Sequence, residues 1–288
     1  MEVEILNPHG YCFGVRSAIV MAKKIKEENK DRNIYILGML VHNEHVIKEL
    51  SNLGIITIDV SPLEYEKEIN KLHQGDILIF TAHGHDERLD TIAKNKGLII
   101  YDAVCPIVKN NIKIIKNELK AQHQVIYIGI KNHPESYAVE SIGKNVILFD
   151  NNLLNNYQLI TDTSPFVANQ TTLNYIDLNE IHKDILSHFP KSRIANEICN
   201  ATRFRQDCIK NLADDIDMLL IVGSNKSSNT KRLLEIANYT HPNIASYIIK
   251  DENDLINIPY QNKRHIAITS GTSTPDEIIQ RVYDYLNK

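Results

Sequence analysis

The feature that most constrains the fold of this sequence is the regular spacing of three of its four cysteines. Cys105 follows Cys12 by 93 residues, and Cys199 follows Cys105 by 94, in a chain of 288 residues. Each interval is close to one third of the chain, and a fixed period in an otherwise irregular sequence indicates an internal repeat. We therefore expect three related units, each with one cysteine at the same place.

The segments beside these cysteines support a repeat. Each cysteine follows a short extended stretch and precedes an amphipathic pattern of about four helical turns. The extended stretches are residues 3–7, 98–102 and 194–198. The helical patterns are residues 15–25, 107–119 and 203–214.

Two further apolar strands follow in each third, and each of them ends in a polar loop. The loops after the first of these strands contain His42, His133 and Ser227, which lie 30, 28 and 28 residues beyond their cysteines. The loops after the second strand contain His83, Thr171 and Ser273. The sequence thus predicts three copies of a βαβα unit, at residues 13–103, 104–197 and 198–288, joined by an N-terminal strand within residues 1–12.

Apolar strands that alternate with amphipathic helices are typical of an α/β fold with parallel sheets covered on both faces. Ligands of such folds bind beyond the carboxyl ends of the strands. If the three units close around a pseudo-threefold axis, the three cysteines meet at its centre and the polar loops line one shared cavity. The alternative is three independent domains with unrelated loops.

Charge and composition exclude several classes of function. The formal net charge is −4 and the pI is near 6.3, which disfavours a nucleic-acid partner because no concentrated basic run is present. No secretory leader and no apolar stretch long enough to span a bilayer is evident, so we expect a cytoplasmic protein. In that reducing compartment cysteines favour metal ligation, redox chemistry or burial over disulfides.

Three convergent thiolates are able to hold zinc, with a histidine as fourth ligand, or an iron–sulfur cluster with one iron left open. Pro106 suits a first helical position and places Cys105 at a helix start, where the thiol pKa is lowered. Structural zinc sites usually take ligands in close pairs, which these are not. Burial of all three as structural thiols is a further alternative. Cys208, nine residues after Cys199, is expected to be a core residue on the far side of that helix.

The motifs taken together resemble those of the LytB/IspH family of 4-hydroxy-3-methylbut-2-enyl diphosphate reductases, from residue 5 to about 285. The resemblance rests on residues 7–15, 41–43, 81–84, 102–106, 133–135, 170–173, 198–202, 222–224, 227–229 and 269–273. The chain departs from the family pattern at Val104, where threonine is expected, and at residues 136–141, which replace the usual valine, glutamate and glycine.

The resemblance implies a trefoil of three α/β units around a [4Fe-4S] cluster with one open iron, ligated by Cys12, Cys105 and Cys199. It also implies reductive removal of the hydroxyl group of 4-hydroxy-3-methylbut-2-enyl diphosphate, which gives isopentenyl and dimethylallyl diphosphate. This is the last step of the non-mevalonate isoprenoid pathway. Reduced ferredoxin or flavodoxin is the implied electron donor.

The resemblance also implies roles for the loop residues. Glu135 is expected to donate a proton to the leaving hydroxyl, and His133 and Thr171 to orient that glutamate and bind the substrate. The expected diphosphate ligands are His42, His83, Ser227, Ser228, Asn229 and Ser273. Two rivals stay open: another threefold iron–sulfur enzyme, such as a quinolinate synthase or a dehydratase, and a non-catalytic redox sensor.

Overall fold

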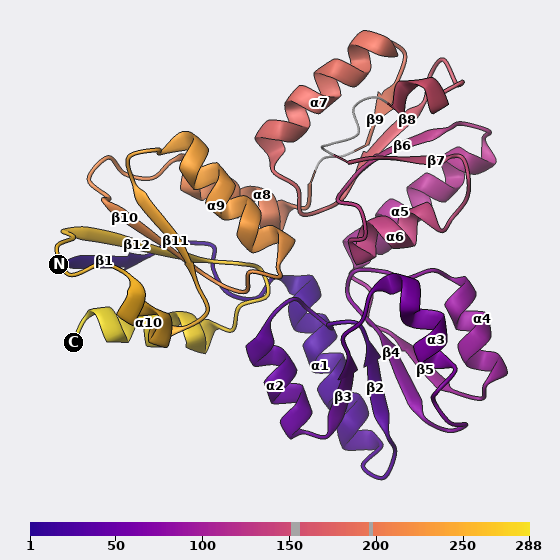
Figure 1. The fold of residues 1–288 in the computed structure, drawn as a ribbon, viewed down its shortest axis with the longest axis horizontal. Helices are drawn as coiled ribbons and strands as arrows, with labels where there is room; N and C mark the ends of the chain where they lie inside the picture. Colours follow the sequence, from indigo (N-terminus) through magenta and orange to yellow (C-terminus); the bar gives the residue numbers. More distant parts are fainter. Residues whose placement is uncertain (151–155, 196–197) are drawn as a thin grey trace.

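Three parallel sheets, each at the centre of its own lobe, make up the protein (Figure 1). The computed structural model describes residues 1–150, 156–195 and 198–288, and in these residues the strands form three sheets of four strands each. The three lobes meet at a common centre, and every neighbouring pair of strands is parallel. The expected α/β class with parallel sheets is confirmed.

The first lobe contains the sheet with strand order β3-β2-β4-β5. Its strands are β2 (Ile34–Leu37), β3 (Ile55–Ile58), β4 (Ile77–Phe80) and β5 (Ile99–Asp102). Its helices are α1 (Phe13–Glu28), α2 (Glu44–Asn52), α3 (Tyr65–Ile69) and α4 (Arg88–Asn95). Ile77 and Ile79 of β4 pack in one core cluster with residues of α1 and α2, whereas Leu78 and Phe80 pack on the other face with α3 and α4.

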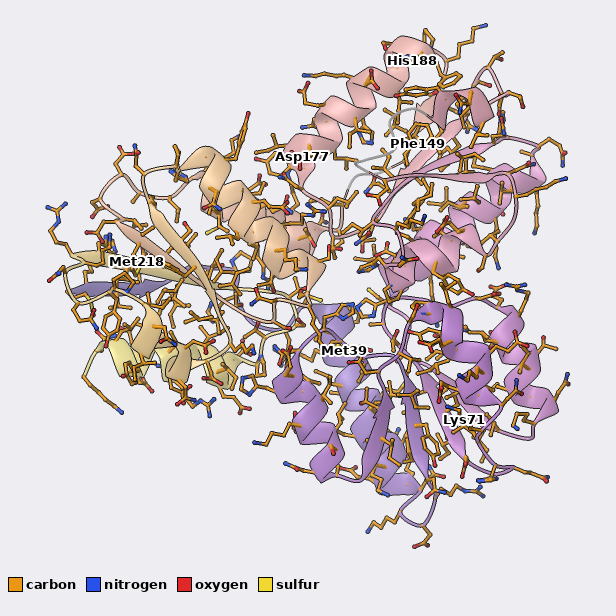
Figure 2. All side chains as sticks on the ribbon, in the orientation of Figure 1. Met39, Lys71, Phe149, Asp177, His188 and Met218 are labelled. Atoms are coloured by element: carbon orange, nitrogen blue, oxygen red, sulfur yellow. The ribbon has the colours of Figure 1, made fainter. Side chains whose placement is uncertain are left out.

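The second lobe has the equivalent order β7-β6-β8-β9. Its strands are β6 (Val125–Ile128), β7 (Val146–Phe149), β8 (Phe166–Asn169) and β9 (Arg193–Ile194). Its helices are α5 (Pro106–Lys120), α6 (Pro134–Glu140) and α7 (Tyr175–His188). Figure 2 shows Phe149 inside this lobe, and only 1% of its surface is exposed.

The third lobe has the order β11-β10-β12-β1. Its strands are β1 (Glu2–Ile5), β10 (Met218–Val222), β11 (Ala245–Ile249) and β12 (His265–Ser270). Its helices are α8 (Asn200–Lys210), α9 (Ser228–Thr240) and α10 (Asp276–Leu286). One core cluster runs from β6 and β8 of the second lobe into α8, α9 and β10, so these two lobes share a continuous apolar interior.

One edge strand of each sheet belongs to the segment that leads into the next unit of the repeat. In each lobe the outermost strand next to β4, β8 or β12 is the segment that leads directly to a cysteine: β5 to Cys105, β9 to Cys199 and β1 to Cys12. The N-terminal strand therefore completes the last sheet, with Val3 opposite Ile266. The boundaries at residues 103/104 and 197/198 stay predictions.

Each sheet has its topological switch point at the same place. From the first central strand (β2, β6 or β10) the chain moves to one edge, then crosses to the other side of that strand to form β4, β8 or β12. Loops that leave adjacent strands in opposite directions open a crevice at the carboxyl ends of those strands, which is where ligands of open α/β sheets bind. Six loops, two from each sheet, thus surround the centre of the molecule.

The structure corrects two details. Each sheet contains a strand that the sequence did not predict, β3, β7 or β11, and the third cysteine helix ends at Lys210, not at residue 214. Asn211 leaves helical geometry with φ −106° and ψ 31°, and the chain turns there. The extended stretch expected at 194–198 falls partly outside the described residues. Within the described ranges, no helix has the length and apolar character needed to cross a bilayer.

Candidate functional site

Three cysteines occupy equivalent positions, each at the N-cap of the first helix of its unit. Cys12 precedes α1, Cys105 precedes α5 and Cys199 precedes α8, and none of their side chains caps its helix by a hydrogen bond. The thiols are therefore left for another partner. A helix N-terminus presents unpaired N–H groups and favours negative charge, which suits a thiolate ligand. Burial nevertheless raises the pKa of Cys12 and of Cys105, so the expected lowering at Cys105 was wrong.

The backbone holds the three cysteines in the same way. Each cysteine N–H donates to the carbonyl oxygen of the second residue beyond the end of β12, β4 or β8. The three bonds are Cys12 to Thr272 (3.1 Å), Cys105 to Ala82 (3.0 Å) and Cys199 to Thr171 (3.2 Å). Each bond joins a helix start to the loop that follows a central strand. The three cysteines are therefore held by the same backbone geometry in each unit of the repeat.

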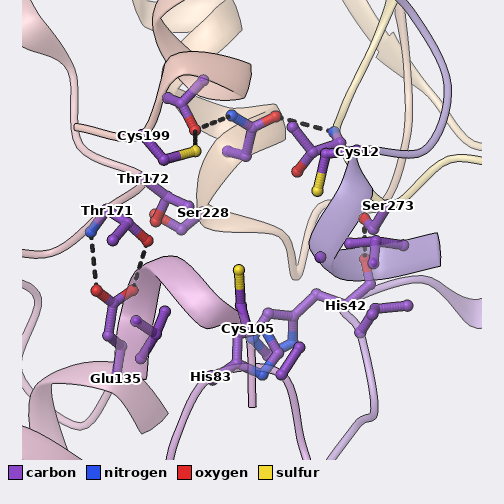
Figure 3. A pocket seen from close by; sticks show the side chains of 18 of the residues that line it. Cys12, His42, His83, Cys105, Glu135, Thr171, Thr172, Cys199, Ser228 and Ser273 are labelled. Carbon is purple, nitrogen blue, oxygen red and sulfur yellow. Dashed lines mark hydrogen bonds between the residues drawn. The ribbon is translucent and has the colours of Figure 1, made fainter. Parts of the chain in front are cut away.

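The three thiols face one central cavity (Figure 3). Cys12, Cys105 and Cys199 all line it and are free cysteines, whereas Cys208 does not line it. The start of α1 lies against Cys105: a Cβ atom on Gly14 would come within 2.6 Å of the Cys105 sulfur. In the described part of the chain, no three or more Cys, His, Asp or Glu side chains form a group that would hold a single metal ion.

Cys208 differs from its prediction as a core residue. It is only half-buried on α8, because the buried positions of that segment are taken by Arg205, Gln206 and Ile209. Helical periodicity therefore directs Cys208 toward the edge of the packed face.

Glu135 is a buried carboxyl group at the start of α6. Only 2% of its surface is exposed, and its Oε1 accepts the Thr171 backbone N–H at 2.9 Å, while Oε2 accepts the Thr171 hydroxyl at 2.9 Å. The Tyr127 hydroxyl donates to Oε1 at 3.3 Å. Burial raises the pKa of Glu135 to about 7, although the bonds from Thr171 and Tyr127 favour the charged form. A neutral carboxylic acid at this place is able to donate a proton near neutral pH.

Three histidines, His42, His83 and His133, gather on one wall of the cavity. The ring centroids of His42 and His83 lie 4.3 Å apart, and each lies 5.8 Å from the ring of His133. Burial lowers the pKa of His42 to about 4 and that of His133 to about 3, and the pKa of His83 is lowered in the same direction. Without a ligand, all three rings are therefore neutral.

The histidines differ in the partners they already have. His133 is the N-cap of α6, where its Nδ1 accepts the Glu135 backbone N–H at 3.2 Å, so its proton sits on Nε2. Both ring nitrogens of His42 are buried and have no hydrogen-bond partner in the described structure. Such unsatisfied buried groups cost about 1–3 kcal/mol each, which a polar ligand in the cavity would recover.

Polar loop residues of the third lobe also line the cavity, but several are engaged with protein groups. Asn229 accepts the Thr272 N–H at 3.0 Å and donates to the Thr202 hydroxyl at 3.2 Å. Ser273 donates to the carbonyl oxygen of His42 at 3.1 Å. The Asn229 bonds join α9 to α8 and to the loop after β12, and the Ser273 bond joins that loop to the first lobe.

Every site residue expected from the sequence lies on this one cavity. They are Cys12, His42, His83, Cys105, His133, Glu135, Thr171, Cys199, Ser227, Ser228, Asn229 and Ser273. The structure adds Thr202, whose hydroxyl contacts the Cys199 sulfur at 3.4 Å, and the buried supports Tyr127 and Gln170. Thr202 belongs to a motif that the sequence displays, but no local signal marks Tyr127.

The comparisons with known proteins agree over the whole chain. A family model described as LytB protein matches residues 3–287. The chain belongs to the LytB family. A 4-hydroxy-3-methylbut-2-enyl diphosphate reductase of Malacoplasma penetrans is 36% identical to it over 294 residues, covering 100% of this chain and 98% of the relative. One from Macrococcus caseolyticus is 36% identical over 290 residues, covering 99% and 89%.

Two solved structures of diphosphate reductases share the fold. The E-1-hydroxy-2-methyl-but-2-enyl-4-diphosphate reductase of Plasmodium falciparum has a TM-score of 0.90 at 29% identity, covering 100% of this chain and 88% of that one. A structure described as (E)-4-hydroxy-3-methyl-but-2-enyl diphosphate reductase, the terminal enzyme of the non-mevalonate pathway, has a TM-score of 0.70 at 28% identity, with 99% of each chain covered. LytB membership argues against a quinolinate synthase or an unrelated dehydratase.

Proposed function

We propose that this chain reduces 4-hydroxy-3-methylbut-2-enyl diphosphate to isopentenyl and dimethylallyl diphosphate in its central cavity. The reaction breaks the bond between C4 and its hydroxyl oxygen, consumes two electrons and two protons, and releases one water. One proton goes to the leaving oxygen and the other to the carbon skeleton, where its position decides which product forms. Full-length similarity to enzymes with this name supports the assignment.

The donor set suits a [4Fe-4S] cluster held by Cys12, Cys105 and Cys199. The three thiols lie at helix starts, do not cap their helices and face one cavity. Gly14 leaves room beside Cys105 that any larger residue would fill. Three protein ligands would leave one iron of such a cluster without a protein ligand. When bound there, the cluster would supply electrons one at a time and a Lewis-acidic iron for the substrate hydroxyl.

Glu135 supplies the proton for the leaving oxygen in this proposal. A general acid is most effective when its pKa lies near the working pH, and the pKa of about 7 meets that condition. The two bonds from Thr171 fix the carboxyl plane, so the acid is held in one orientation. The Thr171 hydroxyl is also in a position to exchange its bond to Glu135 for one to the substrate.

The diphosphate end is bound by the histidine wall and the start of α9. His42 offers two unpartnered ring nitrogens, His83 lies against it, and His133 presents Nε2–H. Ser227 is the N-cap of α9, whose first-turn N–H groups favour phosphate oxygens, with Ser228, Asn229 and Ser273 nearby. An anion beside neutral histidines raises their pKa, so binding favours proton uptake by this wall.

The observation that carries the proposal is the shared cavity: three thiols at helix starts and one buried carboxyl group with a pKa of about 7 face the same space. Reduced ferredoxin or flavodoxin is the proposed electron donor, because the reaction needs single electrons at low potential.

Anaerobic turnover tests the proposal. The iron-loaded enzyme is mixed with 4-hydroxy-3-methylbut-2-enyl diphosphate and reduced methyl viologen, and both dye oxidation and the products are followed. We expect two dye molecules to be oxidised for each substrate, with isopentenyl and dimethylallyl diphosphate as products. Dye oxidation without these products, or none above the substrate-free rate, would contradict the proposed function.

A further inference from the structure

A lysine face runs along α5, the helix that begins at Cys105. Lys109, Lys113, Lys116 and Lys120 follow one another at intervals of four, three and four residues, which places them on one side of the helix. All four line a hollow of about 510 Å³ between α5 and the loop before α4, together with Gly84 and Glu87 of the first lobe. We call these four residues the α5 lysine face.

The charge of this hollow is opposite to that of the chain. The formal net charge of the protein is −4, yet the lining of the hollow contains four lysines and two carboxylates. Lys109 pairs with Asp102 at 2.7 Å, and Lys116 pairs with Glu87. Among the described residues, no ion pair is made by Lys113 or Lys120, both of which are exposed. Positive charge is therefore available at this place for an acidic partner.

The hollow is directly connected to the proposed cluster ligand. Val104, next to Cys105 in the chain, lines it, and the Lys109 N–H donates to the Cys105 carbonyl oxygen at 2.9 Å. Helix α5 runs outward from the centre of the molecule (Figure 1), so Lys113 lies about 12 Å along the axis from Cys105. A protein bound on this face therefore comes close to the central thiols.

Large apolar side chains are exposed beside the same helix starts. Phe13, the first residue of α1, is 78% exposed, and Ile107, the second residue of α5, is 47% exposed. The two starts touch, since Gly14 lies against Cys105. Ile107 lines the central cavity on the side of α5 opposite to the lysines, and neither Phe13 nor Ile107 lines the lysine hollow. Transient redox complexes use small surfaces steered by charge, and the α5 lysine face supplies that charge.

We propose that the α5 lysine face is the docking surface for an acidic one-electron carrier protein. The inference rests on the proposed function, since it names the place where the electrons of that reaction enter. Opposite charges speed the encounter, and the short route along the first turn of α5 leads to Cys105. The substrate loops after β2, β6 and β10 remain free for the diphosphate.

Charge reversal on the helix tests the proposal in the iron-loaded enzyme. The variant carries Lys113→Glu and Lys120→Glu, and turnover is driven by a plant-type ferredoxin that NADPH and its reductase keep reduced. We expect the KM for ferredoxin to rise at least about tenfold and its salt dependence to weaken. The control carries Lys30→Glu and Lys191→Glu, exposed lysines in the loops before β2 and β9, at the amino ends of the strands.

Two further measurements separate this proposal from the proposed function. Turnover with reduced methyl viologen should be equal within about twofold in both variants and the wild type, because a small dye needs no docking surface. Binding of oxidised ferredoxin, measured by calorimetry at low salt, should be lost only in the α5 variant. Equal ferredoxin binding and equal ferredoxin KM in the two variants would overturn the docking surface. Absence of dye-driven turnover in the wild type would instead contradict the proposed function. The calorimetric comparison of ferredoxin binding would still test the docking surface in that case.

Discussion

The chemistry of the cavity depends on the single carboxyl group of Glu135 and on the way its neighbours hold it. Replacing Glu135 by glutamine keeps the shape and the bonds to Thr171 but removes the acidic proton. We expect kcat to fall at least about 10²-fold, while the substrate KM and the visible absorption of the cluster stay nearly unchanged. Steady-state kinetics with a dye reductant measure this change.

The matched control is Glu140→Gln, on the same helix but exposed. It should keep wild-type kcat. A Glu135→Gln enzyme that retained more than about a tenth of wild-type kcat would show that the proton comes from another group, because a positioned acid contributes more than that.

The pH dependence of turnover reports on the same residue. The donor must be protonated, so kcat should be highest below the pKa of about 7 and fall as pH rises through it. The Tyr127 hydroxyl donates to the carboxylate and thereby favours the charged form. Tyr127→Phe should raise the pKa of Glu135 and move the alkaline limb up by about half to one pH unit. An unshifted limb would exclude Tyr127 as a positioning residue for Glu135.

His42 is expected to act on binding, not on the chemical step. Its ring nitrogens have no partner in the described structure, and His42 lines the cavity. His42→Ala should raise the substrate KM about tenfold or more with the cluster absorption intact, since a charge-assisted bond contributes about 1.5–3 kcal/mol. His45→Ala is the control, because His45 contacts Asp251 at 3.2 Å and does not line the cavity. Equal KM in both variants would place the diphosphate elsewhere.

At this scale the sequence predicted which residues share the cavity, because strand ends and helix starts carry them. The sequence could not predict the hydrogen-bond partners of these residues. Tyr127 is the third residue of an apolar strand, and only the fold brings its hydroxyl to Glu135. Likewise, Asn229 looked like a free ligand, but both ends of its amide are used within the protein.

Among the elements, the starts of α1 and α5 lie close together beside the thiols. An alanine at position 14 would place its Cβ 2.6 Å from the Cys105 sulfur and displace it. Gly14→Ala should therefore lose most of its iron, measured per chain after reconstitution, while the unloaded protein keeps its melting temperature within a few degrees. Gly143→Ala, where a Cβ meets no atom within 4 Å, should load iron normally. Full iron content in Gly14→Ala would show that cluster binding does not need the space that Gly14 leaves beside the Cys105 sulfur.

Elements with strong local patterns were predictable, whereas the edge strands β3, β7 and β11 were not. The strands β4, β6 and β10 are continuous apolar runs that are fully buried. The strands β3 and β11 were missed because they lie at sheet edges and are mostly half-buried, so their sequences lack a clear period. The end of α8 was placed too late because the apolar residues Leu212 and Ile216 continue beyond it with near-helical spacing.

The whole molecule follows from the repeat of the cysteines. The nearly equal intervals predicted three units, and in the structure the N-terminal strand β1 completes the sheet of the last lobe. One backbone bond, from each cysteine N–H to a loop of β4, β8 or β12, is repeated three times around the centre. Spacing alone could not show that the second and third lobes share a continuous core while the first has its own.

The claim that three units bring three cysteines to one cluster is tested most directly by iron content. Each of Cys12→Ser, Cys105→Ser, Cys199→Ser and Cys208→Ser is reconstituted without oxygen, and iron, sulfide and visible absorption are measured per chain. We predict four irons in the wild type and in Cys208→Ser, and loss of the intact cluster and of turnover in each of the other three. A normal cluster in any of those three variants, or its loss in Cys208→Ser, would contradict the threefold site.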